Sequence, residues 1–358
     1  MKHNSPIGYG IIGAGIWGEL HTRVLTNDPR VNVLGICDIN EKRAKEIANK
    51  YNIDKYYTDY SAMLADPNIE AISITTPDFA HSEPAINAIN SGKHVLIEKP
   101  MATTTSECLE IIEAQNKFKK YIMVDFHNRW SPAFYNAYES IYNGEVGKVS
   151  YIYFRLSDTT FVPTKYINWA SKSSVLWFLG PHAVDTVRWL FNDEVKEVFA
   201  VSRKNILPQL GIDTPDFYST ILQFEHGGVA HLEHSWIISP NSPNLFDLKC
   251  EIQGSSGTIY IDTSHNSMIQ KYTPLTSQGY PHLSHPDTTL MPIVQNHQIG
   301  FATESIRHFI ESLWADKEPI VNSIDGLRVT EILEAIEKSA KINSPVNVTK
   351  NDIKSKPI

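Results

Sequence analysis

The chain has 358 residues, of which 42% are hydrophobic and 20% charged, and its formal net charge is −8. That length suits two domains, and the apolar fraction excludes a disordered chain. The acidic balance argues against a nucleic-acid partner, which would need a basic face. We find no run of about 18 apolar residues, the length that a membrane-spanning helix needs, and expect no membrane partner.

The cysteines and the start of the chain bear on the cell compartment. Cys37, Cys108 and Cys250 lie far apart. They form neither a disulfide framework nor a metal-ligand spacing. The polar start, residues 1–6, is too short for the charged region of a signal peptide. We therefore expect a cytoplasmic protein without a metal.

In the first third of the chain, short apolar runs alternate with helix-length segments. The pattern predicts strands at residues 7–12, 31–37, 71–75, 94–97 and 121–124. It predicts helices at residues 17–26, 41–51, 82–91 and 103–118. This order is typical of a doubly wound parallel sheet with helices on both faces, and the gaps are long enough for the crossovers.

The pattern of apolar residues changes near residue 128. Alternating apolar runs predict strands at residues 149–156, 195–201, 218–224, 228–234 and 248–253. Period-two alternation favours a mainly antiparallel sheet with one covered face. A long loop is expected at residues 273–298, followed by helices at 302–314 and 324–342. We divide the chain into an α/β domain, residues 1–127, and an α+β domain, residues 128–358, whose last helices return to the first domain.

A glycine-rich segment follows the first predicted strand. Gly13-Ala14-Gly15-Ile16-Trp17-Gly18 is a G-x-G-x-x-G that opens the first predicted helix. Such glycines allow a tight turn and close approach to a pyrophosphate, which the helix N-terminus attracts. Asp38 ends the second strand, where a carboxylate accepts hydrogen bonds from ribose hydroxyls and repels a 2′-phosphate. We predict a Rossmann domain that prefers NAD, while Arg43, five residues on, keeps NADP possible.

Two later loops follow strands of the same predicted sheet. They are Thr75-Thr76-Pro77-Asp78-Phe79-Ala80-His81 and Glu98-Lys99-Pro100. Ligands of doubly wound sheets bind at the carboxyl ends of the strands. Lys99 could hold a substrate hydroxyl there and stabilise its alkoxide. The alternative is an ordinary solvated lysine.

Four motifs together resemble the glucose–fructose oxidoreductase / inositol dehydrogenase (Gfo/Idh/MocA) family. They are the glycine loop at 13–18, T-P-x-x-x-H at 76–81, E-K-P at 98–100 and G-x-H-x-x-D at 180–185. The resemblance covers nearly the whole chain. It implies a Rossmann domain, a C-terminal domain with an open, mainly antiparallel sheet, and a catalytic site between them. It also implies homodimers or homotetramers that act on a small sugar or polyol.

The resemblance implies roles for particular residues. Lys99 and His182 would be catalytic, and the Lys99–Pro100 bond would be cis. The implied cofactor residues are Gly13, Gly15, Ile16, Trp17, Gly18, Asp38, Thr76, Pro77, His81, Glu98, Lys99, Asn128 and Arg129. The implied substrate residues are Lys99, Trp169, Trp177, Phe178, His182 and Asp185.

One position departs from the family pattern. The family typically has an aspartate four residues before the histidine, where this chain has Phe178. That position shares a helix face with His182, but phenylalanine can neither orient a histidine nor bind a hydroxyl. Asp185, three residues after the histidine, is equally well explained as a structural partner.

From these residues we predict an NAD(P)-dependent oxidoreductase acting on a secondary hydroxyl or carbonyl of a sugar or polyol. The nicotinamide carries the hydride, His182 takes the hydroxyl proton, and Lys99 stabilises the alkoxide. Two alternatives stay open because of Phe178. One is an NAD-dependent, redox-neutral glycosidase of the same fold, and the other is a non-catalytic dinucleotide-binding sensor.

Overall fold

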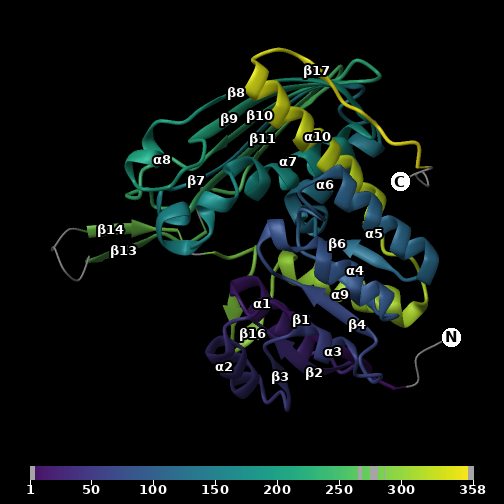
Figure 1. Cartoon of the computed structure of the whole chain (residues 1–358). Helices are drawn as coiled ribbons and strands as arrows, with labels where there is room; N and C mark the ends of the chain where they lie inside the picture. Colours follow the sequence, from purple (N-terminus) through teal and green to yellow (C-terminus); the bar gives the residue numbers. More distant parts are fainter. Residues whose placement is uncertain (1–4, 265–267, 275–280, 286, 354–358) are drawn as a thin grey trace. The chain divides into compact units, whose positions relative to one another are not determined.

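The computed structural model describes residues 5–264, 268–274, 281–285 and 287–353 (Figure 1). The chain divides into two compact units. Unit 1 comprises Met1–Trp130, Met291–Thr330 and Asp352–Ile358, and unit 2 comprises Ser131–Leu290 and Glu331–Asn351. Within the described residues, no helix has the length and apolar character that a bilayer span requires.

Unit 1 is built on a parallel six-stranded sheet in the order β3-β2-β1-β4-β5-β6. The strands are β1 (Ile7–Ile12), β2 (Val31–Cys37), β3 (Tyr56–Tyr57), β4 (Ala71–Ile74), β5 (His94–Ile97) and β6 (Ile122–Val124). Residues of β1, β4 and β6 are buried throughout. Continuous burial is the expected state of parallel strands with helices on both faces. The predicted doubly wound sheet is confirmed.

The helical segments of unit 1 include α1 (Ile16–Thr26), α2 (Glu41–Tyr51), α3 (Tyr60–Leu64), α4 (Ser82–Asn90), α5 (Thr105–Phe118), the 3-10 turns η1 (Asp78–Ala80) and η2 (His127–Trp130), and α9 (Phe301–Ala315). Helices α1, α2, α3 and α4 pack against strands of the sheet. In α2 the buried residues are Ala44, Ile47 and Ala48, at helical spacing. Thr104 and Glu107 form a capping box that starts α5. The late helix α9 packs against α1 and η2.

Unit 2 contains a seven-stranded sheet in the order β12-β11-β7-β10-β9-β8-β17. Its strands are β7 (Val149–Asp158), β8 (Val195–Arg203), β9 (Phe217–Phe224), β10 (Val229–Ser235), β11 (Phe246–Gly254), β12 (Thr258–Asp262) and β17 (Val346–Asn347). All neighbouring pairs are antiparallel except β7 with β10. The expectation of a mainly antiparallel sheet is therefore confirmed.

The long helix α7 (Val175–Phe191) packs against β7, β9 and β10. Most of its residues are buried, as its apolar sequence indicates. The other helices are α6 (Pro132–Tyr142), the π-helical turn η3 (Val162–Tyr166), the 3-10 turn η4 (Ala170–Lys172) and α8 (Ile206–Gln209). The last helix, α10 (Ser323–Ile342), contributes residues to both units, because the division falls after Thr330.

The segment expected to be a loop, residues 273–298, is described in part and contains short hairpins. β13 (Lys271–Pro274) pairs with β14 (Pro281–Ser284), and β15 (Ile293–Val294) pairs with β16 (His297–Gln298). The loop expectation was wrong for these strands. Two to four residues with scattered prolines give no readable alternation, so the pairing itself defines them. Residues 275–280 and 286 of this segment lie outside the described residues.

Candidate functional site

The glycine turn joins β1 to α1 and needs its first and last glycines for different reasons. Gly13 has φ +100°, and a Cβ there would lie 2.7 Å from the Thr75 carbonyl carbon. A Cβ at Gly18 would lie 1.9 Å from the Gly13 oxygen. Gly13 thus permits the left-handed turn, and Gly18 lets helix and loop pack closely. These are the tasks that a dinucleotide fingerprint assigns to its glycines.

The middle of the turn is open. Gly15 is exposed and is the N-cap of α1, without a side-chain capping hydrogen bond. A Cβ there would meet no described atom within 4 Å. Ile16 is also exposed, and Trp17 is half-buried. The first N–H groups of a helix lack intrahelical acceptors and favour an anion. This open, positive helix start fits the pyrophosphate of a dinucleotide.

Asp38 lies beside the turn, directly after β2. Its Oδ2 accepts a hydrogen bond from Ala14 N at 2.7 Å, and its Oδ1 accepts one from Asn40 N at 2.8 Å. The Arg43 Nε donates to the carbonyl oxygen of the same Ala14 at 2.7 Å. One carboxylate and one guanidinium therefore flank Ala14, at the edge of the turn where the fold places an adenosine ribose.

Of the second predicted loop, Thr76 and Pro77 are half-buried and His81 is almost fully buried. The His81 Nδ1 lies 2.6 Å from the Pro100 carbonyl oxygen, and its Nε2 lies 2.8 Å from that of Thr76. His81 thereby links the loop after β4 to the segment after β5. The Thr76 hydroxyl donates to Ala80 O at 2.9 Å.

Lys99 lies two residues after the end of β5, and its bond to Pro100 is cis, as the resemblance implied. Its exposed fraction is 7%. The reading of Lys99 as a solvated lysine is therefore wrong. A buried ammonium needs hydrogen-bonding or charged neighbours, and the adjacent Glu98 is one of the charges close to it.

A cluster of buried polar groups lies next to Lys99 in unit 1. Glu98 follows β5, and Asp125 follows the neighbouring strand β6. The last residue of β5, Ile97, is paired with the last residue of β6, Val124. Neighbouring parallel strands therefore bring the two carboxyl groups together. The His21 Nε2 of α1 lies 3.2 Å from Glu98 Oε1 and 3.6 Å from Asp125 Oδ2.

The two carboxyl groups of this cluster differ in charge. Burial raises the pKa of Asp125 well above its usual range, and the charge of Glu98 raises it further. Burial also acts to raise the pKa of Glu98, but the hydrogen bond and charge of His21 and the charge of Lys99 outweigh it and lower that pKa. Glu98 is thus the anion and Asp125 the protonated partner, as expected when two carboxyl groups share one site.

The cluster continues beyond His21. The His21 Nδ1 lies 2.9 Å from the Ser73 hydroxyl, which lies 3.0 Å from the Tyr9 hydroxyl. His21, Glu98 and Asp125 together offer atoms that could hold a metal ion. Both ring nitrogens of His21 are, however, already in hydrogen-bonding contact within the cluster. The observed contacts therefore favour a hydrogen-bonded network of His21 with its neighbours over a metal site.

The segment after β6, which forms η2, adds further buried polar and aromatic side chains to unit 1. The His127 ring stacks on Trp17 with centroids 5.4 Å apart. Burial lowers the pKa of His127 to about 4, so it is neutral at pH 7. Asn128 is buried. The buried Arg129 pairs with Asp325 at 3.1 Å and so connects η2 to the start of α10.

In unit 2, α7 carries most of the predicted substrate residues. His182 is 8% exposed, and Trp177 and Asp185 are buried. Phe178 and Trp169 are half-buried, with ring centroids 5.9 Å apart. The buried Trp236 also contacts Phe178, with ring centroids 5.7 Å apart. Phe178 therefore belongs to an aromatic cluster where the family pattern has a carboxylate.

Sequence reasoning missed several members of these clusters. Among them are His21, Asp125, His127 and Trp236. One signal could have revealed Asp125, because it follows a buried strand in the same way that Glu98 does. His21 lies inside a helix, and Trp236 lies 58 residues from Phe178 in sequence, so neither has a local signal.

Comparison with known proteins agrees with this architecture. Residues 7–126 match the model of an oxidoreductase family with an NAD-binding Rossmann fold, GFO_IDH_MocA. Residues 138–348 match the C-terminal alpha/beta domain of the same family. The chain belongs to the Gfo/Idh/MocA family. It is an NAD-binding oxidoreductase of the dehydrogenase type.

Two distant relatives match over nearly their whole length. The chain is 26% identical over 355 residues to scyllo-inositol 2-dehydrogenase (NAD(+)) of Bacillus subtilis, covering 97% of each chain. It is 26% identical over 341 residues to the oxidoreductase YrbE of the same organism, covering 95% of this chain and 96% of that one. The crystal structure of myo-inositol 2-dehydrogenase from Lactobacillus plantarum has the same fold. Its TM-score is 0.81 at 22% identity, covering 96% of this chain and all of that one.

Proposed function

We propose that this protein transfers a hydride between NAD and a secondary hydroxyl or carbonyl of a cyclic polyol, sugar or sugar derivative. The observation that carries the proposal is the buried Lys99 on a cis bond at the end of β5, beside charged Glu98, in an NAD-binding oxidoreductase. The names of the relatives, inositol 2-dehydrogenases among them, support a polyhydroxylated ring as substrate.

When bound, the nicotinamide accepts or donates the hydride. In our proposal, the Lys99 ammonium holds the substrate hydroxyl and stabilises the negative charge that develops on its oxygen. The His182 imidazole takes the hydroxyl proton during oxidation and returns it during reduction. Glu98 supplies a negative charge next to the Lys99 side chain, whose own charge lowers the pKa of Glu98.

The aromatic cluster supports a particular kind of substrate. Phe178 and Trp169 present half-buried rings, whereas a carboxylate at position 178 would bind a hydroxyl. Aromatic faces pack against C–H groups. We therefore propose a ring substrate that lacks a hydroxyl, or carries an apolar substituent, at the carbon that would face Phe178.

The protein would assemble as a homodimer or homotetramer in the cytoplasm.

The test is NADH formation from NAD⁺ with inositols, aldoses, deoxy sugars and acidic sugars. We expect one stereochemical class to react, with at least a roughly hundredfold loss in both Lys99→Ala and His182→Ala, a typical size for proton-transfer groups. Lys117→Ala and His226→Ala, which remove a lysine and a histidine from exposed surface positions, serve as controls and should retain activity.

Two results would contradict the proposal. Cleavage of a glycoside with bound NAD and no net NADH would indicate redox-neutral glycoside chemistry. Tight NAD binding, with no turnover and no effect of either alanine variant, would indicate a sensor.

A further inference from the structure

We propose that Glu19 sets the preference of this protein for NAD over NADP by engaging the guanidinium of Arg43 beside the adenosine ribose position. Rossmann folds accommodate a 2′-phosphate with an arginine near the acidic residue that ends β2. This chain has both groups. The structure shows which groups already engage its arginine.

Arg43 stands at the place that NADP recognition requires. Its Nε donates to Ala14 O at 2.7 Å, and Asp38 accepts from Ala14 N at 2.7 Å. The guanidinium and the Asp38 carboxylate therefore lie on either side of one residue of the glycine turn. A phosphate on the ribose hydroxyl that faces Asp38 would come close to Arg43.

The remaining nitrogens of Arg43 are bound by carboxylates. Its Nη2 donates to Glu19 Oε2 at 2.7 Å, and its Nη1 lies 3.1 Å from Glu46 Oε1. With Nε on a carbonyl oxygen, all three guanidinium nitrogens have acceptors. A 2′-phosphate would have to compete with two carboxylates for this guanidinium, and it would also face the charge of Asp38.

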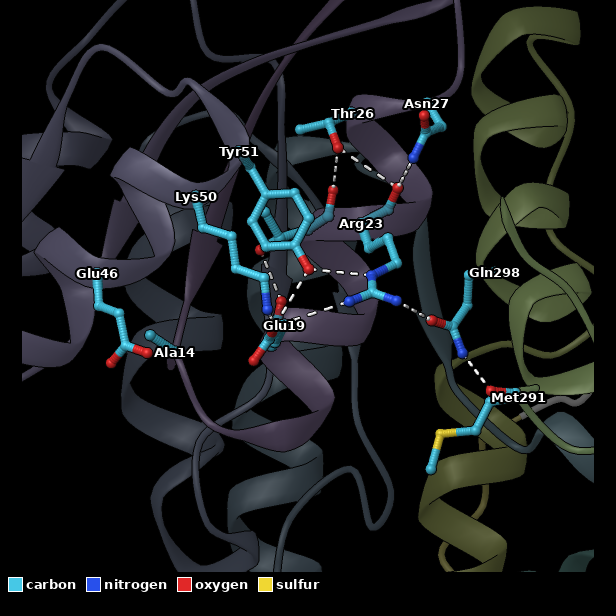
Figure 2. Close-up of polar contacts among 12 residues, drawn as sticks. Ala14, Glu19, Arg23, Thr26, Asn27, Glu46, Lys50, Tyr51, Met291 and Gln298 are labelled. Atoms are coloured by element: carbon cyan, nitrogen blue, oxygen red, sulfur yellow. Dashed lines mark hydrogen bonds and ion pairs between the residues drawn. The ribbon is translucent and has the colours of Figure 1, made fainter. Parts of the chain in front are cut away.

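Glu19 is held more firmly than Glu46. Figure 2 shows Glu19 of α1 next to Lys50 and Tyr51 of α2, with Arg23 on the neighbouring turn of its own helix. Its Oε1 accepts from Lys50 Nζ at 2.5 Å and from the Tyr51 hydroxyl at 3.2 Å. Its side chain is 22% exposed, whereas that of Glu46 is 58% exposed. Exposed i,i+3 pairs such as Arg43–Glu46 contribute little.

Glu19 carries its charge at neutral pH. Partial burial acts to raise its pKa, but the hydrogen bonds from Lys50 and Arg43 outweigh burial and lower it. Glu19 therefore works as a fixed anion. Arg23 reinforces the arrangement, because its Nε donates to the Tyr51 hydroxyl at 3.0 Å and its Nη1 to Gln298 Oε1 at 3.1 Å.

The test compares the dissociation constants of NADH and NADPH, measured by fluorescence titration of the full chain. In Glu19→Gln, which keeps the size of the side chain and removes its charge, Arg43 becomes available to the 2′-phosphate. We expect the NADPH dissociation constant to fall about tenfold, with that of NADH changed less than about twofold. NADPH should also raise the unfolding temperature more in the variant than in the unchanged protein.

Three further variants decide the assignment. Glu46→Gln removes a carboxylate from the same guanidinium and should change the NADPH constant less than about threefold. Glu19→Gln combined with Arg43→Gln should lose the gain, whereas Glu19→Gln combined with Lys50→Gln should keep it. The proposal is overturned if the gain survives without Arg43, or if it requires Lys50 instead.

The single variant Arg43→Gln keeps the proposal testable if Glu19→Gln does not fold. With the arginine already engaged by Glu19, its removal should leave NADPH affinity nearly unchanged. A fall of about tenfold in that affinity would mean that Arg43 already binds the 2′-phosphate in the unchanged protein. Glu19 would then have no role in the preference.

Discussion

At the scale of single residues, Glu98 and Asp125 show how two neighbouring carboxyl groups take different charge states. Both side chains are buried at the ends of paired strands, and His21 contacts both. Two adjacent buried anions would repel strongly in a medium of low dielectric constant. One carboxyl group therefore keeps its proton, and the closer contact with His21 selects Glu98 as the anion.

This assignment predicts unequal effects of two isosteric changes on the free energy of unfolding. Asp125→Asn resembles the protonated carboxyl group and should alter the free energy of unfolding at pH 4.5 by less than about 1 kcal/mol. Glu98→Gln removes the charged partner of a buried pair and should lower it by about 3 kcal/mol. Urea unfolding of the two variants provides the measurement. Equal losses in both would contradict the assignment.

The same pair has a pH signature. Because the folded pKa of Asp125 is raised, its contribution to stability is complete below its ordinary value of 3.8 and is lost as pH rises toward the folded pKa. The Asp125→Asn variant has no carboxyl group to ionise at this position, so it should gain on the unchanged protein between pH 4.5 and 7. The gain cannot exceed about 1.4 kcal/mol per pH unit. The absence of a gain over this range would show that Asp125 is already ionised in the folded protein.

At the scale of elements, two glycines of the turn between β1 and α1 have different roles, Gly18 in packing and Gly15 in binding. Gly18 is surrounded by the Gly13 carbonyl and the Thr75 hydroxyl, whereas the space next to Gly15 is open among the described residues. A methyl group at position 18 therefore meets protein. A methyl group at position 15 meets whatever binds at the start of α1.

We accordingly expect Gly18→Ala to lower the free energy of unfolding by about 1–3 kcal/mol. Gly15→Ala should lower it by less than about 1 kcal/mol, since Gly15 has φ −69°, which alanine adopts readily. Both should weaken NADH binding by about tenfold or more. Thermal unfolding and NADH titration, done on the same samples, check both statements. Normal NADH binding by Gly15→Ala would show that the pyrophosphate lies elsewhere.

At the scale of the whole molecule, the chain forms two compact units. It leaves unit 1 after Trp130 and returns at Met291, and α9 then packs on α1 and η2. The glycine turn, Asp38, the His81 loop and Lys99 all belong to unit 1. The free energy of cofactor binding should therefore stabilise that unit in particular.

Hydrogen exchange with and without NADH tests this distribution. At a concentration of NADH about one hundred times its dissociation constant, stabilisation should reach about 2.7 kcal/mol. Protection should rise over residues 13–18, 38–43 and 75–81 and in α9. Strands β9 and β10 of unit 2 serve as an internal reference and should change little. An equal rise in those strands would mean that the chain responds to the cofactor as one cooperative body.

Most strands and helices, and the α/β and α+β classes of the two parts, were predictable from local patterns in the sequence. Strands β1, β2 and β5 and helix α2 occur at the predicted bounds, because periodicity and helix caps are properties of neighbouring residues. The family followed from four short motifs for the same reason. Elements with little local pattern, such as the two-residue β3 and the single-turn α3, were missed.

Which polar groups meet depends on how the chain folds in three dimensions. His21 lies 77 residues from Glu98, and Glu19 lies 24 residues from Arg43. Such contacts depend on strand order and helix packing, which no local pattern contains. The charge states of Glu98 and Asp125, the engagement of Arg43 and the aromatic surroundings of Phe178 therefore became visible only when the folded chain brought these side chains together.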